Sequence, residues 1–402
     1  MPKVITDNER ISEVLERGVE KIYPDKKQLK ELLLSGKKIR LYCGFDPSSP
    51  SLHIGNAIQI NKLAQFQALG HEVIFLIGDF TGMIGDPTDK DSVRKKITRE
   101  EAVNNSQNYQ QQAGAYLNFE GNNSAQIMYN SEWHDKMNFA ELIELSSNFT
   151  VQQMIQRGMF QERLKQEKPI YLHEFLYPLA QAYDSVSMNV DLEVGGNDQM
   201  FNMLAGRDLM KALSKKDKSV MTLRLLADAH GDKMGKTTGN ALFLDTDPNN
   251  MYGILMSWPD EVIGLTFELC TKLPWLEVKE IQKQLKDNSV NPRDLKMKLA
   301  FEITNIVHGQ DKANQAQEYF KSTVQNKEAP DDVCEVKADK GTTILDAVIK
   351  AMDGQKSNND IRRLFDQGGV TVDNKKITDV KAEVQEGIYK VGKRNWFKVK
   401  IN

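Results

Sequence analysis

The chain has 402 residues, of which 40% are hydrophobic and 27% charged, a composition typical of a globular protein with two or three domains. Its longest apolar runs fall far short of the roughly 20 residues that span a bilayer. Its first residues lack the apolar core of a signal peptide, so we expect a cytoplasmic protein with no membrane segment. Three separate cysteines without a CxxC pair, and six scattered histidines, argue against a disulfide framework and against a structural metal.

The formal net charge of −3 is unevenly distributed. Residues 336–402 contain 14 Lys and Arg against 9 Asp and Glu, a net charge of +5, so the rest of the chain carries −8. A basic tail on an acidic body favours a tail that binds a polyanion. Charge alone leaves a second interpretation open, which is a solvated charged surface.

A strand, a helix and a second strand are predicted in quick succession near the N-terminus. Residues 38–45 have the pattern of a strand, and 53–69 have helical spacing of apolar residues with Gly70 as a natural stop. Residues 71–77 form a buried strand rich in Val and Ile. Together they make a βαβ unit, which predicts a parallel sheet and a Rossmann-like α/β fold that binds nucleotides.

The later elements suggest an interrupted sheet and two smaller domains. Further strands are predicted at 125–129 and 189–194, and the mostly helical sequence between them reads as an insertion. Residues 248–320 show helical patterning with Pro and Gly breaks, and the tail contains a strand–turn–strand pattern. The predicted organisation is an α/β domain at 1–241 with an insertion at about 134–170, a helical domain at 242–322, a linker at 323–337 and a small α+β domain at 338–402.

The first motif that carries chemistry is YCGFDPSSPSLHIGN, residues 42–56. A strand ends near Gly44 and a helix opens near His53, which directs backbone N–H groups and the positive helix end to the carboxyl edge of the sheet. Gly55 leaves room for a flat ring, and His53 can donate to a phosphate oxygen as charge builds there. Taken alone, the HIGN segment is weak evidence, because a histidine at the start of a helix is more often a cap or a core residue.

The second motif is HGDKMGKTTGN, residues 230–240. Two lysines flank a glycine in a glycine-rich segment, so Lys233 and Lys236 can oppose the charge of a leaving pyrophosphate while Thr237 donates a hydrogen bond. A surface turn that happens to contain lysines is the alternative interpretation. The order of the two motifs makes the combination more specific than either part.

The pair HIGN and KMGKT resembles the two signatures of class I aminoacyl-tRNA synthetases, HIGH and KMSKS. More narrowly, YCGFDPSSPSLHIGN, IGDFTGMIGDPTDK, YPLAQAYD, VGGNDQ and KMGKT resemble the tyrosyl-tRNA synthetases of bacteria, over essentially the whole chain. The resemblance implies a two-step reaction in which tyrosine attacks ATP to give tyrosyl-adenylate and pyrophosphate, and the tRNA 3′ end then takes the tyrosyl group. It also implies Mg²⁺ accompanying ATP, and a homodimer formed through the insertion.

The resemblance assigns roles to individual residues. Tyr42 and Asp184 match the pair that binds the substrate phenol, which needs a donor and an acceptor once it is buried. The residues matched to the rest of tyrosine are Asp86, Tyr177 and Gln181 at the ammonium group and Gln199 near the carboxylate. The residues matched to ATP and its transition state are Ser48, His53, Cys43, Gly55, Asn56, Gly196, Asp198, Lys90, Arg94, Lys233, Lys236 and Thr237.

Two positions depart from the family signatures. Asn56 replaces the second histidine of HIGH, and Gly235 replaces the serine of KMSKS. Asn56 keeps hydrogen-bonding capacity toward the ribose, and Gly235 removes no charge, so we expect neither to abolish activity. The tail resembles a small RNA-binding module shared with a ribosomal small-subunit protein, and it presents Arg362 and Arg363 on a helix beside a hairpin.

Three alternatives stay open at this point. A tryptophanyl enzyme would share the fold and both signatures, but Tyr42, Asp184 and the RNA-binding tail argue against it. A small-molecule nucleotidyltransferase would explain neither the lysine segment nor the two C-terminal domains. A synthetase-derived RNA-binding or splicing protein is disfavoured by the complete set of site residues.

Overall fold

The computed structural model describes residues 3–88, 97–227, 241–325, 333–352, 357–373, 375–377, 379–392 and 395–402. These residues form two compact units. The first unit comprises Met1–Thr246 and Ser257–His308, and the second comprises Asp247–Met256 and Gly309–Asn402. The domain boundaries expected from the sequence stay a prediction.

The first unit is built on a six-stranded sheet with the order β1-β6-β5-β2-β3-β4. Its strands are β1 (Val19–Tyr23), β2 (Arg40–Phe45), β3 (Glu72–Ile77), β4 (Gln126–Tyr129), β5 (Leu192–Gly196) and β6 (Ser219–Leu223). All neighbouring pairs are parallel except β1 with β6. The predicted α/β class with a parallel sheet is therefore confirmed, while β1 and β6 were not foreseen.

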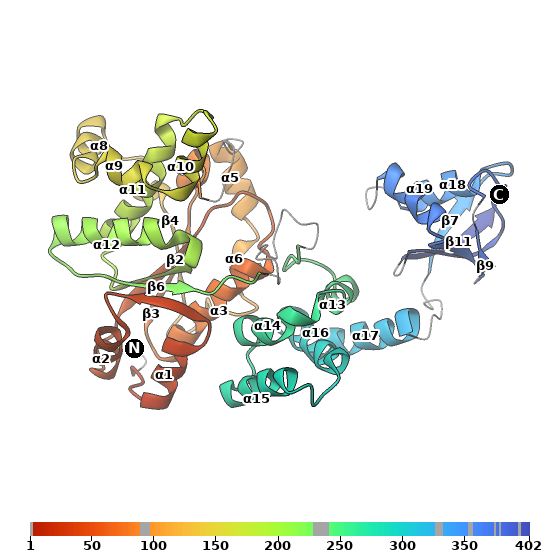
Figure 1. Cartoon of the computed structure of the whole chain (residues 1–402), viewed down its shortest axis with the longest axis horizontal. Helices are drawn as coiled ribbons and strands as arrows, with labels where there is room; N and C mark the ends of the chain where they lie inside the picture. The colour runs from red at the N-terminus through yellow and green to blue at the C-terminus, as the bar shows by residue number, and fades with distance from the viewer. Residues whose placement is uncertain are drawn as a thin grey trace. The chain divides into compact units, whose positions relative to one another are not determined.

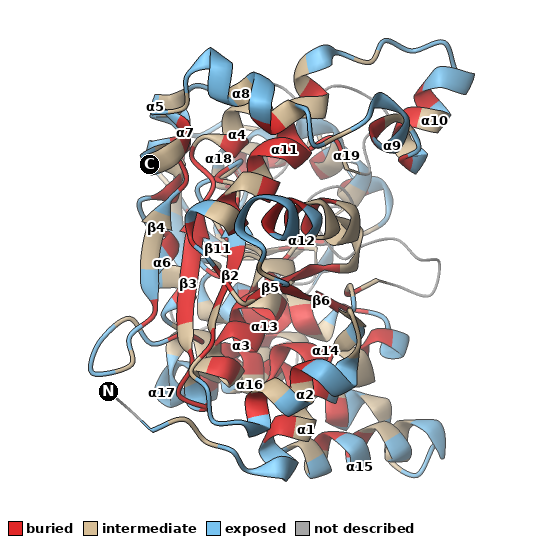
Figure 2. Cartoon of the chain, turned by 90° about the vertical axis from the view of Figure 1, so that its left-hand side faces the viewer, coloured by how far each residue is buried: buried red, intermediate tan, exposed pale blue. Residues whose placement is uncertain are grey.

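Helices cover both faces of this sheet (Figures 1 and 2). Helix α3 (Ile54–Ala68) connects β2 to β3 and packs against β2, β3 and β5, while α12 (Met200–Ser214) connects β5 to β6 and packs on the opposite face. The chain thus winds in both directions away from the β2–β5 pair. In sheets of this kind, ligands bind where the direction reverses, at the carboxyl ends of the strands.

The remaining helices of the first unit surround this core. Before and between the first strands lie α1 (Asn8–Glu16), α2 (Lys26–Leu34), α4 (Thr81–Ile84), α5 (Arg99–Ser106) and α6 (Tyr109–Ala113). The predicted helical insertion consists of α7 (Ser131–His134), α8 (Phe139–Ser146), α9 (Val151–Ile155) and α10 (Gly158–Lys165), and α11 (Leu172–Ser187) follows it. Helices α14 (Ile263–Cys270), α15 (Trp275–Lys286) and α16 (Pro292–His308) complete the unit.

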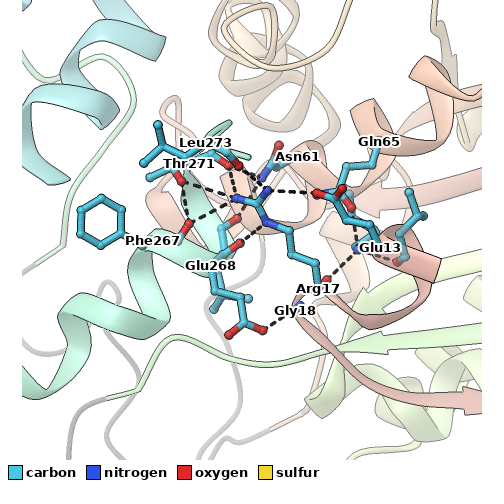
Figure 3. A network of polar contacts seen from close by, with 12 residues as sticks. Glu13, Arg17, Gly18, Asn61, Gln65, Phe267, Glu268, Thr271 and Leu273 are labelled. Carbon is cyan, nitrogen blue, oxygen red and sulfur yellow. Dashed lines mark hydrogen bonds and ion pairs between the residues drawn. The ribbon is translucent and has the colours of Figure 1, made fainter. Parts of the chain in front are cut away.

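Arg17, just after α1, joins the N-terminal segment to α14 (Figure 3). Its guanidinium donates to four backbone carbonyl oxygens, those of Phe267, Glu268, Thr271 and Leu273, at 2.8–3.4 Å. The last carbonyls of a helix have no partner within it, and a cation at this end also opposes the negative pole of the helix dipole. Arg17 therefore caps α14 from a segment about 250 residues away in sequence.

The second unit contains two helices and a small α+β fold. The helices are α13 (Pro248–Met256) and α17 (Gln310–Phe320), the latter followed by a short π-helical turn (Lys321–Gln325). The five-stranded sheet has the order β7-β11-β10-β8-β9, formed by β7 (Cys334–Ala338), β8 (Val370–Val372), β9 (Lys375–Lys376), β10 (Gly387–Val391) and β11 (Asn395–Ile401). Helices α18 (Ile344–Ala351) and α19 (Asn358–Asp366) complete its core.

Two features of the second unit bear on the sequence predictions. The β8–β9 pair is antiparallel, as the strand–turn–strand pattern predicts. Strand β7 lies within the segment interpreted as a linker, and it pairs in parallel with β11. Among the described residues, none of the helices has the length and apolarity needed to cross a membrane.

Candidate functional site

A pocket of about 440 Å³ opens at the carboxyl ends of β2 and β5, where the winding direction of the sheet reverses. It is lined by 13 of the residues singled out from the sequence, namely Tyr42, Cys43, Ser48, His53, Gly55, Asn56, Asp86, Tyr177, Gln181, Asp184, Gly196, Asp198 and Gln199. They come from segments up to about 150 residues apart in sequence. The fold therefore places close in space the residues for which the sequence only suggested a common role.

The start of α3 forms one wall of the pocket. His53 is the N-cap residue, with extended backbone, and its backbone N–H donates to Asn56 Oδ1 at 3.0 Å. A Cβ on Gly55 would lie 2.8 Å from the imidazole Cε1 of His53, so glycine here leaves space for the histidine ring. The helix therefore presents His53, its positive end and its first N–H groups at the pocket mouth.

Helix α11 forms the opposite wall. Tyr177, Gln181 and Asp184 are spaced by four and three residues, which places them on one face of the helix. That face lines the pocket, since all three residues are among its lining. Helical periodicity thus explains why the YPLAQAYD motif contributes three polar groups to a single site.

Asp184 is 2% exposed and is surrounded by N–H donors. Trp133 Nε1 donates to its Oδ1 at 2.8 Å, His134 Nε2 lies 2.8 Å from the same oxygen, and Asn130 Nδ2 donates to Oδ2 at 3.3 Å. Burial raises the pKa of Asp184 above its usual range, and the contact with His134 opposes that shift. Tyr42 is also buried, and burial raises its pKa well above the usual value, with the Glu193 and Asp184 carboxylates adding to the effect.

A second carboxylate, Asp46, orients the other end of α11. It accepts from the Tyr177 hydroxyl at 2.8 Å and from Thr81 Oγ1 at 2.7 Å. A Cβ on Gly78 would lie 2.1 Å from Asp46 Oδ1, so only glycine allows the carboxylate to approach β3. Asp46 is therefore held between the end of β3 and the Tyr177 side chain.

A third carboxylate, Asp86, lies across the pocket. Its Oδ2 accepts from Gln199 Nε2 at 2.7 Å, and its Oδ1 accepts from the backbone and hydroxyl of Thr88 at 2.9 and 2.6 Å. Asn202 Nδ2 in turn donates to Gln199 Oε1 at 2.9 Å. Asp86 and Gln199 thus form one hydrogen-bonded cluster from two distant segments, as expected of groups that act on the same substrate.

The end of β5 supplies the remaining polar groups of the pocket. Gly196 ends the strand, and a Cβ there would lie 2.4 Å from Asp198 Oδ1. Cys43, on the adjacent β2, is 2% exposed, and burial raises the pKa of its thiol. Because that thiol stays protonated near neutral pH, it can serve as a neutral donor and not as a nucleophile.

Seven of the predicted residues remain. Lys90, Arg94, Lys233, Lys236 and Thr237 lie outside the described residues. Arg362 and Arg363 lie on α19 in the second unit, where Ile361 and Phe365 are buried and both arginines are exposed.

Sequence reasoning missed several residues that hold the pocket groups in place. They are Asp46, Thr81, Asn130, Trp133, His134, Ser185, Glu193 and Lys218. Asp46 and Thr81 lie inside two of the quoted motifs, and their position there could have marked them. Trp133 and His134 belong to the segment interpreted as an insertion, and nothing in their spacing points to the site.

Comparison with known proteins agrees with this geometry. The family of class I tRNA synthetases (W and Y) matches residues 34–325. The tyrosine–tRNA ligase of Thermotoga maritima is 39% identical over 399 residues, and that of Haemophilus ducreyi is 39% identical over 396 residues; each alignment covers 98% of both chains. A C-terminally truncated mitochondrial tyrosyl-tRNA synthetase of Coccidioides posadasii matches with a TM-score of 0.64 and 26% identity, covering 77% of this chain and 91% of that one. The chain therefore belongs to the class I tRNA synthetase family, in the branch of the bacterial tyrosine–tRNA ligases.

Proposed function

We propose that the chain is a tyrosine–tRNA ligase, which activates tyrosine with ATP and transfers it to the 3′ end of its tRNA. The observation that carries the proposal is the pocket at the reversal point of the sheet, with Tyr42 and Asp184 at its buried end and His53 at its mouth. The tyrosine carboxylate attacks the α-phosphate in line, and pyrophosphate leaves. Catalysis then rests on positioning and on stabilising charge at the phosphate.

Each end of tyrosine has matching groups in the pocket. The phenol lies between Tyr42 and Asp184, where a carboxylate accepts and a hydroxyl donates. The ammonium group is held by Tyr177, Gln181 and Asp86, since a cation leaving water needs acceptors. Gln199, whose side chain donates a hydrogen bond to Asp86, lies near the carboxylate of the substrate tyrosine.

ATP binds over the α3 end of the same pocket. Ser48 and His53 stabilise the charge that develops on the α-phosphate. The ribose and base lie along Gly55, Asn56, Cys43, Gly196 and Asp198, and Lys90, Arg94, Lys233, Lys236 and Thr237 bind the pyrophosphate. The described residues contain no group of three or more His, Cys, Asp and Glu that could hold a metal ion. In our proposal Mg²⁺ enters with the ATP phosphates, as Mg²⁺ at phosphate sites commonly does.

Pyrophosphate exchange with each of the twenty amino acids tests this function. We expect tyrosine alone to support rapid exchange. Exchange with tryptophan in place of tyrosine would favour the tryptophanyl alternative, and no exchange with any amino acid would favour a non-enzymatic RNA-binding protein.

We also infer that the active form is a homodimer. Large apolar side chains are exposed along α8–α10 and the start of α11, namely Phe139 (76%), Ile143 (58%), Val151 (69%), Leu164 (47%), Tyr171 (49%) and Leu172 (79%). Figure 2 shows exposed surface along α8 and α10. A monomer rarely leaves so many large apolar groups together in water, and the segment is the one that the family resemblance assigns to the dimer interface.

Sedimentation tests the dimer. Phe139→Glu with Leu172→Glu should shift the protein to the mass of one chain. Leu276→Glu is the matched control, because Leu276 is equally exposed (79%) but lies on α15. A parent protein that sediments as a monomer would remove this part of the proposal.

The basic tail is proposed to bind tRNA through α19. Arg362→Glu with Arg363→Glu should reduce tRNA charging while leaving tyrosine-dependent pyrophosphate exchange unchanged, because the arginines lie in the second unit. Normal charging by this variant would assign tRNA binding to other residues. The cytoplasmic location expected from the sequence stays a prediction.

A further inference from the structure

A buried ion pair joins the wall of the substrate pocket, at Glu193, to Lys218 behind it. Lys218, just before β6, and Glu193, in β5, are 0% and 2% exposed, and their charged groups are in direct contact. Lys218 Nζ also donates to Ser185 Oγ at 2.7 Å, and Ser185 is fully buried on α11. Burial of an ion pair carries a large desolvation penalty, so its position beside a ligand pocket calls for a functional explanation.

The space for this contact is provided by a glycine. A Cβ on Gly206 of α12 would lie 2.7 Å from Lys218 Nζ and 3.0 Å from Ser185 Oγ. The absence of a side chain on α12 therefore allows the ammonium group to reach Ser185. This is an observation independent of the ion pair itself.

The pair connects to both ends of the proposed tyrosine site. Ser185 Oγ lies 2.9 Å from the Tyr42 hydroxyl, which reads the phenol in the proposed function. On the other side, Glu193 Oε1 accepts from Gln181 Nε2 at 3.0 Å. Gln181 is a lining residue of the pocket, and its Oε1 is buried without a hydrogen-bond partner among the described residues.

The direction of the hydrogen bonds follows from the donors and acceptors available. A tyrosine phenol has one proton, and the Asp184 carboxylate can only accept, so the phenol donates to Asp184. The phenol oxygen can then only accept, and Tyr42 must direct its own proton to it. With substrate bound, Tyr42 consequently accepts from Ser185 across the 2.9 Å contact, in place of the longer 3.3 Å bond that Ser185 donates to Glu193 Oε2 in the structure, while Lys218 donates to the Ser185 oxygen.

Glu193 could defeat this arrangement. Its carboxylate also lies close to the Tyr42 hydroxyl and to Ser185 Oγ, at 3.3 Å from the latter, and an unneutralised carboxylate would draw their protons away from the substrate. Lys218 neutralises Glu193 by direct contact. Burial lowers the pKa of Lys218, while the Glu193 charge opposes that shift and favours the ammonium form.

We propose that Lys218 and Glu193 are positioning residues for tyrosine: through Ser185 they turn the Tyr42 proton toward the substrate phenol, and through Gln181 they turn an acceptor toward its ammonium group. This inference rests on the proposed function and adds to it. The specificity for tyrosine over phenylalanine then depends on Lys218 and Ser185, which are not among the residues that line the pocket, and on Glu193, which lines it.

The test is the ratio of kcat/KM for tyrosine to kcat/KM for phenylalanine in pyrophosphate exchange. Ser185→Ala breaks the hydrogen-bond chain from Lys218 through Ser185 to Tyr42, here called the relay, but keeps the ion pair. It should lower the ratio roughly tenfold by raising KM for tyrosine, because about 1.4 kcal/mol of hydrogen-bond energy corresponds to a factor of ten. Phenylalanine lacks the phenol oxygen, so its KM should stay close to that of the parent. A purely structural defect would lower both activities equally, and that result would overturn the proposal.

A double-mutant cycle sharpens the test. Lys218→Met should lower the ratio at least as much as Ser185→Ala, because it also leaves Glu193 unneutralised, and adding Ser185→Ala to Lys218→Met should lower it no further. Losses that multiply in the double variant would contradict the relay. Lys216→Met is the matched control, since Lys216 pairs with Asp191 outside the pocket, and its ratio should equal that of the parent.

Two outcomes separate this inference from the proposed function. A parent protein without tyrosine-dependent exchange would remove the proposed function. A parent that is active, with an unchanged ratio in Ser185→Ala, would remove only the relay. If Lys218→Met fails to fold, the Ser185→Ala measurement still decides.

Discussion

Among the described residues of the first unit two lysines are buried, and the protein compensates their charges differently. Lys62, on α3, donates to the carbonyl oxygens of Val14 and Arg17 and to Gln65 Oε1, each at 2.7 Å, so its acceptors are all neutral. Lys218 contacts the Glu193 carboxylate. Burial, together with the neighbouring Arg17 charge, lowers the pKa of Lys62 to about 7.

The difference shows that hydrogen bonds and charge compensation are separate requirements. Three neutral oxygens satisfy the N–H groups of Lys62 but offset little of the charge, so this lysine can lose its proton near neutral pH. A carboxylate partner offsets the charge of Lys218, at the expense of a second buried ion. Lys62 is therefore suited to holding the N-terminal segment against α3, a structural role. Lys218 keeps its positive charge and can act electrostatically on groups beside the substrate pocket.

The largest expected effect comes from removing the charged partner of Glu193. Lys218→Met should lower the free energy of unfolding by about 3–5 kcal/mol, because it leaves a carboxylate buried and unpaired. Urea unfolding at pH 7 measures the loss. Lys218→Met combined with Glu193→Leu should recover much of the stability but not the preference for tyrosine. If Lys218→Met alone is as stable as the parent, Lys218 and Glu193 do not form a buried charge pair in solution.

A smaller effect is expected at the Arg17 junction in Figure 3. Arg17→Met should lower the free energy of unfolding by about 2–3 kcal/mol, since buried carbonyl oxygens at the end of α14 lose their donors, while the ion-pair partner Glu13 is exposed enough to be solvated. Arg17→Lys should recover only part of this stability, because a single ammonium cannot reproduce the planar fork of N–H donors that the guanidinium directs at these carbonyl oxygens. Equal stability of Arg17→Lys and the parent would mean that charge alone, without the fork, caps α14.

The smallest effect depends on pH. The pKa of Lys62 is lowered in the folded state, so between pH 7 and the ordinary lysine value the unfolded chain binds the extra proton, and stability rises with pH in that window. Relative to Lys62→Met, the parent should gain roughly 1–2 kcal/mol from pH 6.5 to pH 8.5. Below pH 6 the difference between the two proteins should become constant.

The control measurement on Lys62→Met is its preference for tyrosine over phenylalanine. The ratio of kcat/KM for tyrosine and phenylalanine should be the same in Lys62→Met and in the parent, since Lys62 lies at the N-terminal junction and not beside the pocket. A stability difference that does not change with pH would show that Lys62 keeps its charge, and the contrast with Lys218 would then fail.

The sequence predicts the central part of the fold and much of the pocket. The βαβ unit follows from periodicity, whereas Tyr42 and Asp184 were assigned through the resemblance to the tyrosyl-tRNA synthetases. Strand β1 is half exposed, and β6 is a short apolar run between polar segments, so neither pattern is distinctive. The Lys218–Glu193 contact joins residues 25 positions apart across two strands, and only the register of β5 and β6 reveals it.

Specificity for tyrosine is most directly tested at Tyr42. In Tyr42→Phe the substrate phenol loses its only proposed hydroxyl donor, while Asp184 and the packing of the ring are retained. The ratio of kcat/KM for tyrosine to kcat/KM for phenylalanine, measured by pyrophosphate exchange, should fall roughly tenfold or more from the parent value. The fall should come from a lower kcat/KM for tyrosine, while kcat/KM for phenylalanine stays close to that of the parent. An unchanged ratio would mean that Tyr42 does not read the phenol, and both the assignment of tyrosine to this pocket and the relay behind it would be wrong.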